Sequence, residues 1–228
     1  MVPNVEAIRF ATDDGVSLEG ELRRPDGEAV GSAVICHAHP RHGGSKDHPI
    51  LWAIRNTLAH RGFVVLAFNF RGTMGSAGTY AGGRAETRDV DAAIGRVRQG
   101  ADGPTLVCGW SFGAAVALRE ALGDERVSAL ALIALPLDPA DIDVPLVPAA
   151  AELRVFRRPT LLLAGEGDVY CPRPRLEALG TAMPNAEVVI LPGTDHFLWR
   201  REKEAAEAVG AFAGRAFGGR EPDGGTPD

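Results

Sequence analysis

Short apolar runs alternate with helical patterns along nearly the whole chain, and this alternation constrains the fold more than any other feature. Two strands are expected at residues 5–10 and 16–24, around a turn. The pattern then predicts further strands at 32–36, 64–68, 105–108, 127–134, 160–164 and 187–191. Helices are predicted at 49–60, 84–98, 173–182 and 197–213, and one more follows residues 109–113 and runs to about 122. Such alternation predicts an α/β fold with a doubly wound, mostly parallel sheet covered on both faces. Ligands bind such sheets at the carboxyl ends of the strands.

The chain length of 228 residues suits one domain with a short tail. We expect a single domain over residues 1–213. Residues 136–158 hold four prolines and little periodicity, which leaves room for a minimal cap of a loop and one short helix. Residues 214–228 are rich in glycine, proline and charge, so we expect a disordered tail.

The overall charge is mildly acidic, with a formal net charge of −6. It offers no electrostatic reason to expect binding of nucleic acid or of an anionic membrane. The three cysteines are odd in number and widely spaced, which does not resemble a disulfide framework. The first ten residues lack the pattern of a signal peptide, and no apolar run is long enough to span a bilayer. By elimination we expect a soluble cytoplasmic protein.

Residues 109–113, Gly-Trp-Ser-Phe-Gly, match the pattern G-x-S-x-G directly after the strand predicted at 105–108. In this pattern the serine lies on a tight turn between a strand and a helix. The turn lifts the hydroxyl clear of the sheet and points the N-terminus of the helix at a developing negative charge. A glycine-rich turn whose serine merely caps the helix is the alternative. The position at a strand end favours Ser111 as a nucleophile.

A serine hydroxyl is a poor nucleophile unless a base takes its proton and a third group holds that base. His196 is the one histidine that follows Ser111 in the sequence, and it comes after the strand predicted at 187–191. In one known arrangement of such residues the nucleophile, the acid and the base follow one another in that order along the chain, and His196 fits the last position. We therefore expect His196 to be the general base, with a surface histidine near the last helix as the alternative.

The acid should follow an earlier strand, and three carboxylates compete for the role. Asp168 lies in the loop after the strand at 160–164 and is the preferred candidate. Glu166 in the same loop and Asp138 after the preceding strand remain alternatives. Asp195 is interpreted as a turn residue, because a side chain cannot easily point at the ring of its immediate neighbour.

The loop after the strand at 32–36 reads His-Ala-His-Pro-Arg-His-Gly-Gly, from His37 to Gly44. A loop in this position can supply one backbone N–H to an oxyanion, while the residue after the nucleophile supplies the other. The expected donors are therefore His39, or its immediate neighbour, and Phe112. Pro40 is excluded because proline has no backbone N–H.

These motifs together carry a family resemblance. The loop H-x-H-P-x-x-G-G, the run Asn-Phe-Arg-Gly at 69–72, and Gly-Ser-x-Gly at 75–78 resemble small, nearly lidless bacterial α/β-hydrolases related to dienelactone hydrolases and carboxylesterases. The resemblance extends from about residue 5 to residue 213. It implies the doubly wound sheet and the Ser–Asp–His triad, and it leaves the substrate open. The first His-Pro that is usual in this loop is replaced here by His37-Ala38.

Four histidines, at positions 37, 39, 42 and 48, also allow a zinc-binding interpretation. No carboxylate-rich partner segment accompanies them, and the hydrolase loop explains the same residues, so we expect no metal and no cofactor. Candidates for the substrate pocket are residues expected near the same edge of the sheet. They are His37, Arg71, Met74, Tyr80, Trp110 and Leu137, with core packing or a structural loop role as the alternative for each.

The preferred function is that of a serine hydrolase, which cleaves a small carboxylic ester through an acyl-serine intermediate. Acyl transfer or thioester cleavage in a biosynthetic pathway would use the same triad. A non-catalytic binder on this fold is disfavoured, because all three triad residue types occur at the expected strand ends. The expected partner is a small-molecule ester or thioester, while the oligomeric state is open.

Overall fold

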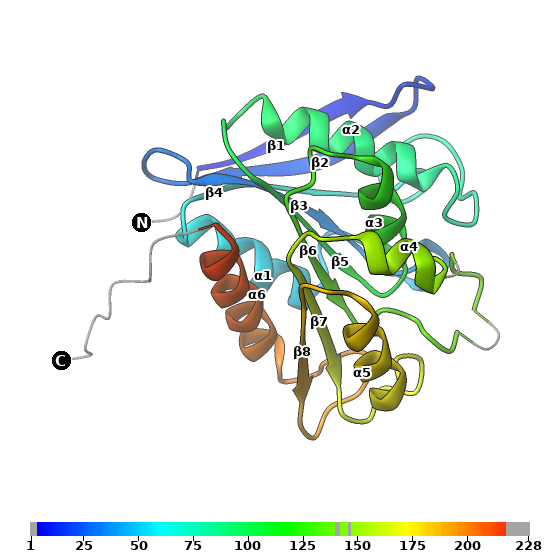
Figure 1. Cartoon of the computed structure of the whole chain (residues 1–228). Coiled ribbons are helices and arrows are strands. Elements are labelled where there is room, and N and C mark those ends of the chain that lie inside the picture. The colour runs from blue at the N-terminus through cyan, green and yellow to red at the C-terminus, as the bar shows by residue number, and fades with distance from the viewer. Residues whose placement is uncertain (1–3, 140–141, 146, 218–228) are drawn as a thin grey trace.

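The computed structural model describes residues 4–139, 142–145 and 147–217, and it contains one eight-stranded sheet in the order β1-β2-β4-β3-β5-β6-β7-β8 (Figure 1). Strands β3 to β8 pair in parallel, whereas β1 and β2 form an antiparallel edge next to β4. The predicted doubly wound, mostly parallel sheet is confirmed. The strands are β1 (Asn4–Ala11), β2 (Ser17–Arg24), β3 (Gly31–Cys36), β4 (Phe63–Phe68), β5 (Thr105–Trp110), β6 (Ala129–Ile133), β7 (Thr160–Gly165) and β8 (Ala186–Leu191).

Helices cover both faces of the sheet, as Figure 1 shows. One apolar cluster joins α1 and α6 to one face, and a second joins α2, α3 and α5 to the other. The helices are α1 (Pro49–His60), α2 (Glu86–Arg98), α3 (Phe112–Gly123), α4 (Ala150–Val155), α5 (Arg173–Ala182) and α6 (Glu202–Phe217). A sheet covered in this way has strands that are apolar along their whole length, and every residue of β3 to β7 is buried.

The parallel register brings the ends of the central strands to one edge of the sheet. Cys36 at the end of β3 pairs with Gly109 of β5, and Trp110 pairs with Ile133 of β6. On the other side of β6, Gly165 of β7 pairs with Leu191 of β8. The loops that follow these strands therefore meet at a single rim, which is where such sheets bind ligands.

The last helix begins later and ends later than the sequence pattern predicts. Residues 194–201 form turns, and α6 runs from Glu202 to Phe217 rather than over 197–213. The turns persist because Leu198 and Arg200 adopt positive φ angles of 54° and 64°, which a right-handed helix does not allow. Because α6 extends to Phe217, the first residues of the tail expected over 214–228 are helical, and residues 218–228 lie outside the described residues.

The segment between β6 and β7 carries the short cap. Within its described residues, one helix occurs, the six-residue α4. The remainder is loop, in which Leu137 and Asp138 donate their backbone N–H groups to the carbonyl oxygen of Tyr170. In the parts of the chain that the structure describes, no helix is long and apolar enough to cross a membrane.

Candidate active site

Ser111 occupies the sharp turn between β5 and α3. Its backbone angles, φ 55° and ψ −118°, are unusual for a residue with a side chain. Two glycines make the turn possible, because a Cβ atom on Gly109 would collide with the backbone of Gly113, and one on Gly113 would collide with the carbonyl oxygen of Cys36. The hydroxyl therefore stands above the carboxyl end of the sheet, at the N-terminus of α3.

His196 lies between Ser111 and Asp168. The Ser111 hydroxyl donates to His196 Nε2 over 2.8 Å, and the Nδ1–H of His196 donates to Asp168 Oδ2 over 2.9 Å. This tautomer follows from the carboxylate, which can only accept in its ionised form. The His196 backbone is also held, since Trp110 Nε1–H donates to its carbonyl oxygen over 3.2 Å. The structure thus brings together the three residues that the sequence places at three strand ends.

The carboxylate of Asp168 is fully buried and held in place by the backbone. Its Oδ1 accepts hydrogen bonds from the N–H groups of Tyr170 and Cys171, each over 2.9 Å. These bonds fix the orientation of the carboxylate toward the histidine. Tyr170 also packs its ring edge-to-face against the His196 ring, with centroids 5.0 Å apart.

The alternative acids lie elsewhere. Asp138 is about half exposed and pairs with Arg175 over 3.5 Å. Glu166 accepts a hydrogen bond from the backbone N–H of Gly193 over 3.1 Å. Asp195 accepts from the N–H of Phe197, as expected of a turn residue. Across the described residues, no carboxylate other than Asp168 binds the His196 ring.

Of the two expected oxyanion donors, Phe112 follows the serine directly and His39 lies in the loop after β3. Phe112 is the first residue of α3, and the first N–H groups of a helix have no partner within the helix. His39 lines the cavity above Ser111 and begins the short 3-10 helix at Pro40–His42. The ring of His39 is tied down, because Nδ1 accepts from Arg41 N–H over 3.1 Å and Nε2–H donates to the carbonyl oxygen of Asp143 over 2.8 Å.

A cavity of about 410 Å³ opens over Ser111 and His196. Aromatic rings dominate its wall, together with small residues of the loop after β3. The rings belong to His39, His42, His48, Trp110, Tyr170, Phe197 and Trp199. The described residues that line it include no Asp, Glu, Lys or Arg, so no carboxylate, ammonium or guanidinium group borders the cavity.

Two of the expected pocket residues are corrected to structural roles. His37 is buried, and its Nε2 accepts from the N–H of Phe70 while Nδ1–H donates to Ala38. Burial lowers the pKa of His37 to about 4, so the ring is neutral. Arg71 is also buried and binds Asp89 over 2.7 Å and Asp14 over 2.9 Å, which leaves its guanidinium engaged in the loop.

The other four expected pocket residues divide between the cavity and its surroundings. Trp110 lines the cavity. Met74 is 76 % exposed and lies outside the lining. Tyr80 lies behind the lining, where its hydroxyl donates to the carbonyl oxygen of Asp143 over 2.6 Å. Leu137 is half-buried against the core rather than in the cavity.

The cavity wall contains several residues that the sequence prediction did not place there, among them Ile142, Tyr170, Phe197 and Trp199. Phe197 and Trp199 fall within a predicted helix, whose apolar positions are normally interpreted as core. The signal that could have identified them is their position directly after His196, in a chain with three tryptophans in total. The position of His48 before a predicted helix suggests a capping residue, yet its ring packs 4.3 Å from that of Trp110.

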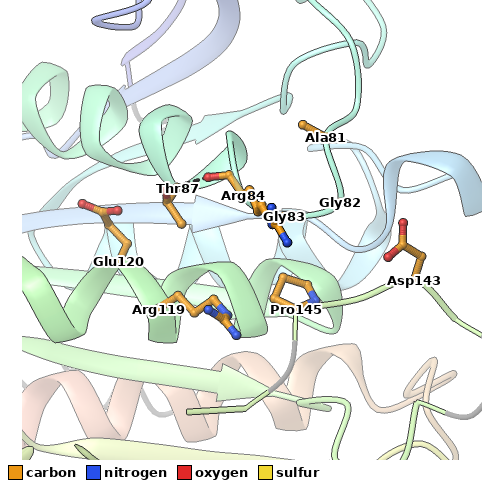
Figure 2. A pocket seen from close by; sticks show the side chains of 9 residues that line it. All are labelled: Ala81, Gly82, Gly83, Arg84, Thr87, Arg119, Glu120, Asp143 and Pro145. Carbon is orange, nitrogen blue, oxygen red and sulfur yellow. Dashed lines mark hydrogen bonds between the residues drawn. The ribbon is translucent and has the colours of Figure 1, made fainter.

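A larger cavity, of about 650 Å³, lies away from the serine between α2, α3 and the cap (Figure 2). Arg84 and Thr87 border it on one side, and Arg119 and Glu120 of α3 on the other. Its described lining contains no serine, cysteine or histidine, so it offers no counterpart to the nucleophile and base of the smaller cavity. Asp143 belongs to its wall, and the carbonyl of the same residue binds His39 on the side of the active site.

Among the described residues, one group of acidic side chains lies close enough together to hold a metal ion: Asp91, Glu120 and Asp124. Arg126 binds both Asp91 and Asp124, so their negative charge already has a partner. The cluster lies outside the lining of the Ser111 cavity. It therefore provides no metal for chemistry at the serine.

The family of the protein follows from this geometry together with a match over most of the chain. The profile of a family described as "Alpha/beta hydrolase domain" matches residues 31–216. The chain belongs to the alpha/beta hydrolase family. The matched region contains β3 to β8 and all three residues of the Ser111–His196–Asp168 chain. Membership of the family supports hydrolase activity in general.

Solved structures similar to this alpha/beta hydrolase support the fold. A Xanthomonas campestris protein, described as an α/β serine hydrolase without lid, superposes with a TM-score of 0.77 at 24 % identity, over 98 % of this chain and 97 % of that one. A serine hydrolase homologue from Coxiella burnetii gives 0.78 at 27 % identity, over 90 % and 96 %. An esterase from Pyrococcus furiosus gives 0.78 at 18 % identity, over 94 % of each chain.

Proposed function

We propose that this alpha/beta hydrolase cleaves small carboxylic esters through an acyl-serine intermediate. The observation that carries the proposal is the continuous hydrogen-bonded chain from Ser111 Oγ through the His196 ring to the buried Asp168 carboxylate, with links of 2.8 and 2.9 Å. In this arrangement His196 takes the serine proton as the oxygen attacks the ester carbonyl. Asp168 holds the ring in the required tautomer and stabilises the imidazolium that forms.

The same groups serve both halves of the reaction. The tetrahedral oxyanion accepts hydrogen bonds from the N–H of Phe112 and from the N–H of His39 or its neighbour, and the N-terminus of α3 adds a favourable partial charge. His196 then gives its proton to the leaving alcohol, which departs and leaves an acyl-serine. A water molecule, activated by the same histidine, attacks the acyl group and releases the acid and the free serine.

The size and chemistry of the cavity suggest the substrate class. A volume of about 410 Å³ suits a small molecule, and a wall without Asp, Glu, Lys or Arg suits a neutral ester. The short cap is consistent with the resemblance to dienelactone hydrolase and carboxylesterase relatives, and with the Xanthomonas relative described as lacking a lid. The similar Pyrococcus furiosus protein is itself described as an esterase.

The test is covalent labelling with a fluorophosphonate probe, followed by hydrolysis of p-nitrophenyl butyrate. We expect the wild type to be labelled at Ser111 and to turn the ester over. Ser111→Ala should lose both, with a fall in kcat/KM of at least about a thousandfold. Ser128→Ala is the matched control, because Ser128 lies at the opposite end of β5 and binds the N–H of Thr105.

Two results would contradict the proposal in different ways. Activity of Ser111→Ala within tenfold of wild type would remove this serine from the mechanism. Labelling of Ser111 without turnover of any simple ester would instead favour acyl transfer to an acceptor other than water.

A further inference from the structure

Two large aromatic side chains stand exposed beside His196. Phe197 is 46 % exposed and Trp199 is 54 % exposed, and both line the cavity over the serine. Side chains of this size bury most of their surface in ordinary folded proteins. Their exposure at the mouth of the candidate active site therefore suggests a ligand that covers them.

The backbone between these rings is built to keep them exposed. Leu198, the residue between them, is fully buried and has a φ of 54°, and Arg200 after them has a φ of 64°. Such angles are unfavourable for residues with side chains and persist only where the surroundings enforce them. The N–H of Leu198 donates to Asp195, and that of Arg201 donates to Leu198. The segment thus buries its aliphatic residue and presents both aromatic rings.

The exposed rings belong to a group of aromatic side chains next to His196, here called the collar, which consists of Phe197, Trp199, Tyr170 and His48. Phe197 and Trp199 stack with centroids 6.3 Å apart and an interplanar angle of 26°. Phe197 lies 5.8 Å from His196, and Tyr170 lies 5.0 Å from it, both edge-to-face. The centroid of the His48 ring lies 5.8 Å from that of the Trp199 ring.

Because the collar lies next to His196, its position indicates which part of a bound ester would contact it. His196 must deliver its proton to the oxygen of the departing alcohol, so that oxygen comes within hydrogen-bond distance of Nε2. The alcohol group therefore leaves along the side of the cavity that His196 and the residues after it border. Phe197 follows His196 directly and packs against its ring, and Trp199 stacks on Phe197, so both rings border the cavity next to His196.

We propose that this hydrolase prefers esters whose leaving alcohol carries an uncharged planar ring, which packs against Phe197 and Trp199. The inference rests on the proposed esterase function and adds the class of its leaving group. Flat ring faces stack on aromatic side chains better than puckered rings of the same size, by about threefold to tenfold in affinity. The described lining contains no Asp, Glu, Lys or Arg that could pair with a charged ring, which matches an uncharged one.

The test compares matched esters on matched variants of the whole chain. Benzyl butanoate and cyclohexylmethyl butanoate differ in the planarity of the alcohol ring, and ethyl butanoate lacks the ring. Because kcat/KM covers the steps up to departure of the alcohol, whereas all three esters share one deacylation step, the preference should lie in kcat/KM. The variants are Phe197→Leu and Trp199→Leu. Trp52→Leu is the control, since Trp52 is 55 % exposed on α1 and lies outside the lining of the cavity.

We expect the wild type and Trp52→Leu to prefer the benzyl ester over the cyclohexylmethyl ester by about threefold to tenfold. Trp199→Leu and Phe197→Leu should lose most of this preference, because kcat/KM should fall further for the benzyl ester than for the cyclohexylmethyl ester or for ethyl butanoate. An equal loss for all three esters would overturn the inference, as would an unchanged preference in both variants.

A second pair of esters distinguishes the two sides of the scissile bond. Ethyl 3-phenylpropanoate and ethyl 3-cyclohexylpropanoate place the ring on the acid, and we expect Trp199→Leu to leave their ratio unchanged. If the variant alters this ratio instead, the rings contact the acyl group and the inference is wrong. Turnover of ethyl butanoate without any ring preference would reject the inference alone, whereas failure to turn over any ester would reject the proposed function with it.

Discussion

Ser111 shows how one residue can combine an unfavourable conformation with a reactive position. Its left-handed φ of 55° places the side chain above the sheet, in line with the N-terminus of α3. A serine there gains nothing for stability over a glycine, which adopts such angles freely. The strain is maintained by close packing of Gly109 and Gly113 beneath it. Strained residues of this kind cluster at functional sites.

The carboxylate of Asp168 should matter far more than that of Asp138. In Asp168→Asn the amide can neither stabilise the imidazolium of His196 nor fix its tautomer, so kcat should fall by about a thousandfold to ten-thousandfold. Asp138→Asn should stay within about twofold of wild type, because this exposed side chain only pairs with Arg175. Steady-state kinetics on p-nitrophenyl butyrate decides the matter. An inactive Asp138→Asn beside an active Asp168→Asn would reassign the acid to the loop after β6.

His37 couples the stability of the fold to pH. Burial lowers the pKa of its ring from 6.5 to about 4, so between these values the unfolded chain binds a proton that the folded chain does not. The folded state therefore loses stability as pH falls from about 6.5 to 4, and the loss from this group is on the order of 3 kcal/mol. Well above pH 6.5 the ring is neutral in both the folded and the unfolded chain, so it no longer makes the free energy of unfolding depend on pH.

Urea unfolding of His37→Gln at several pH values tests this coupling. The glutamine keeps an acceptor for the N–H of Phe70 but does not titrate, so its stability should decline less than that of wild type between pH 6.5 and 4. His60→Gln, which replaces an exposed histidine at the end of α1, should follow the wild-type curve. Parallel curves for wild type and His37→Gln would show that the buried ring does not carry the effect.

At the scale of elements, the approach of α3 to β3 depends on Gly113. A Cβ atom there would lie well inside contact distance of the carbonyl oxygens of Cys36 and His37. Gly113→Ala should therefore destabilise the fold by about 1–3 kcal/mol or more, and push α3 away from the loop that carries His39. Thermal and urea unfolding measure the first effect, and esterase kinetics measures the second.

Gly123 provides the control on the same helix. It ends α3, and a Cβ atom there meets nothing within 4 Å. Gly123→Ala should be neutral, or stabilising by up to about 1 kcal/mol, because alanine has the higher helix propensity. Equal stabilities for the two variants would mean that close packing at Gly113 is not what holds α3 against β3.

Elements with a clear period were predictable, and those shaped by distant contacts were not. The fully apolar runs from β3 to β7 identified buried parallel strands, and their order placed Ser111, Asp168 and His196 at strand ends. The prediction for segment 197–201 was wrong, because its apolar residues fit a helical pattern while the structure holds Leu198 and Arg200 at positive φ. That choice depends on the core that receives Leu198, which local sequence does not specify.

The same limit applies to the pocket. Arg71 and His37 are polar residues after strands, which on sequence grounds suits a substrate contact as well as a structural one. Their roles depend on Asp89, Asp14 and Phe70, and most of these partners come from other parts of the chain. Pairings across such distances are not visible in periodicity or composition.

At the scale of the whole molecule, the segment between β6 and β7 bears on how substrate reaches the serine. Between β6 and β7 the described residues form a loop and the short helix α4, and Asp143 of this loop is tied to His39 and Tyr80. A lipase lid closes a large apolar flap over its site and opens it at a lipid surface. The described residues of this segment are held by hydrogen bonds to the rim of the site and form no comparable flap.

We therefore predict that the enzyme shows no activation at a lipid interface. The rate on p-nitrophenyl butyrate and tributyrin should rise smoothly with concentration and saturate, without a jump where the substrate forms a separate phase. Because the cavity of about 410 Å³ suits a small molecule rather than a long extended chain, kcat/KM should be at least about tenfold higher for butanoyl than for dodecanoyl esters. A steep increase in rate above the solubility limit would contradict this view, since it would require a mobile apolar cover that the segment between β6 and β7 is too short to supply.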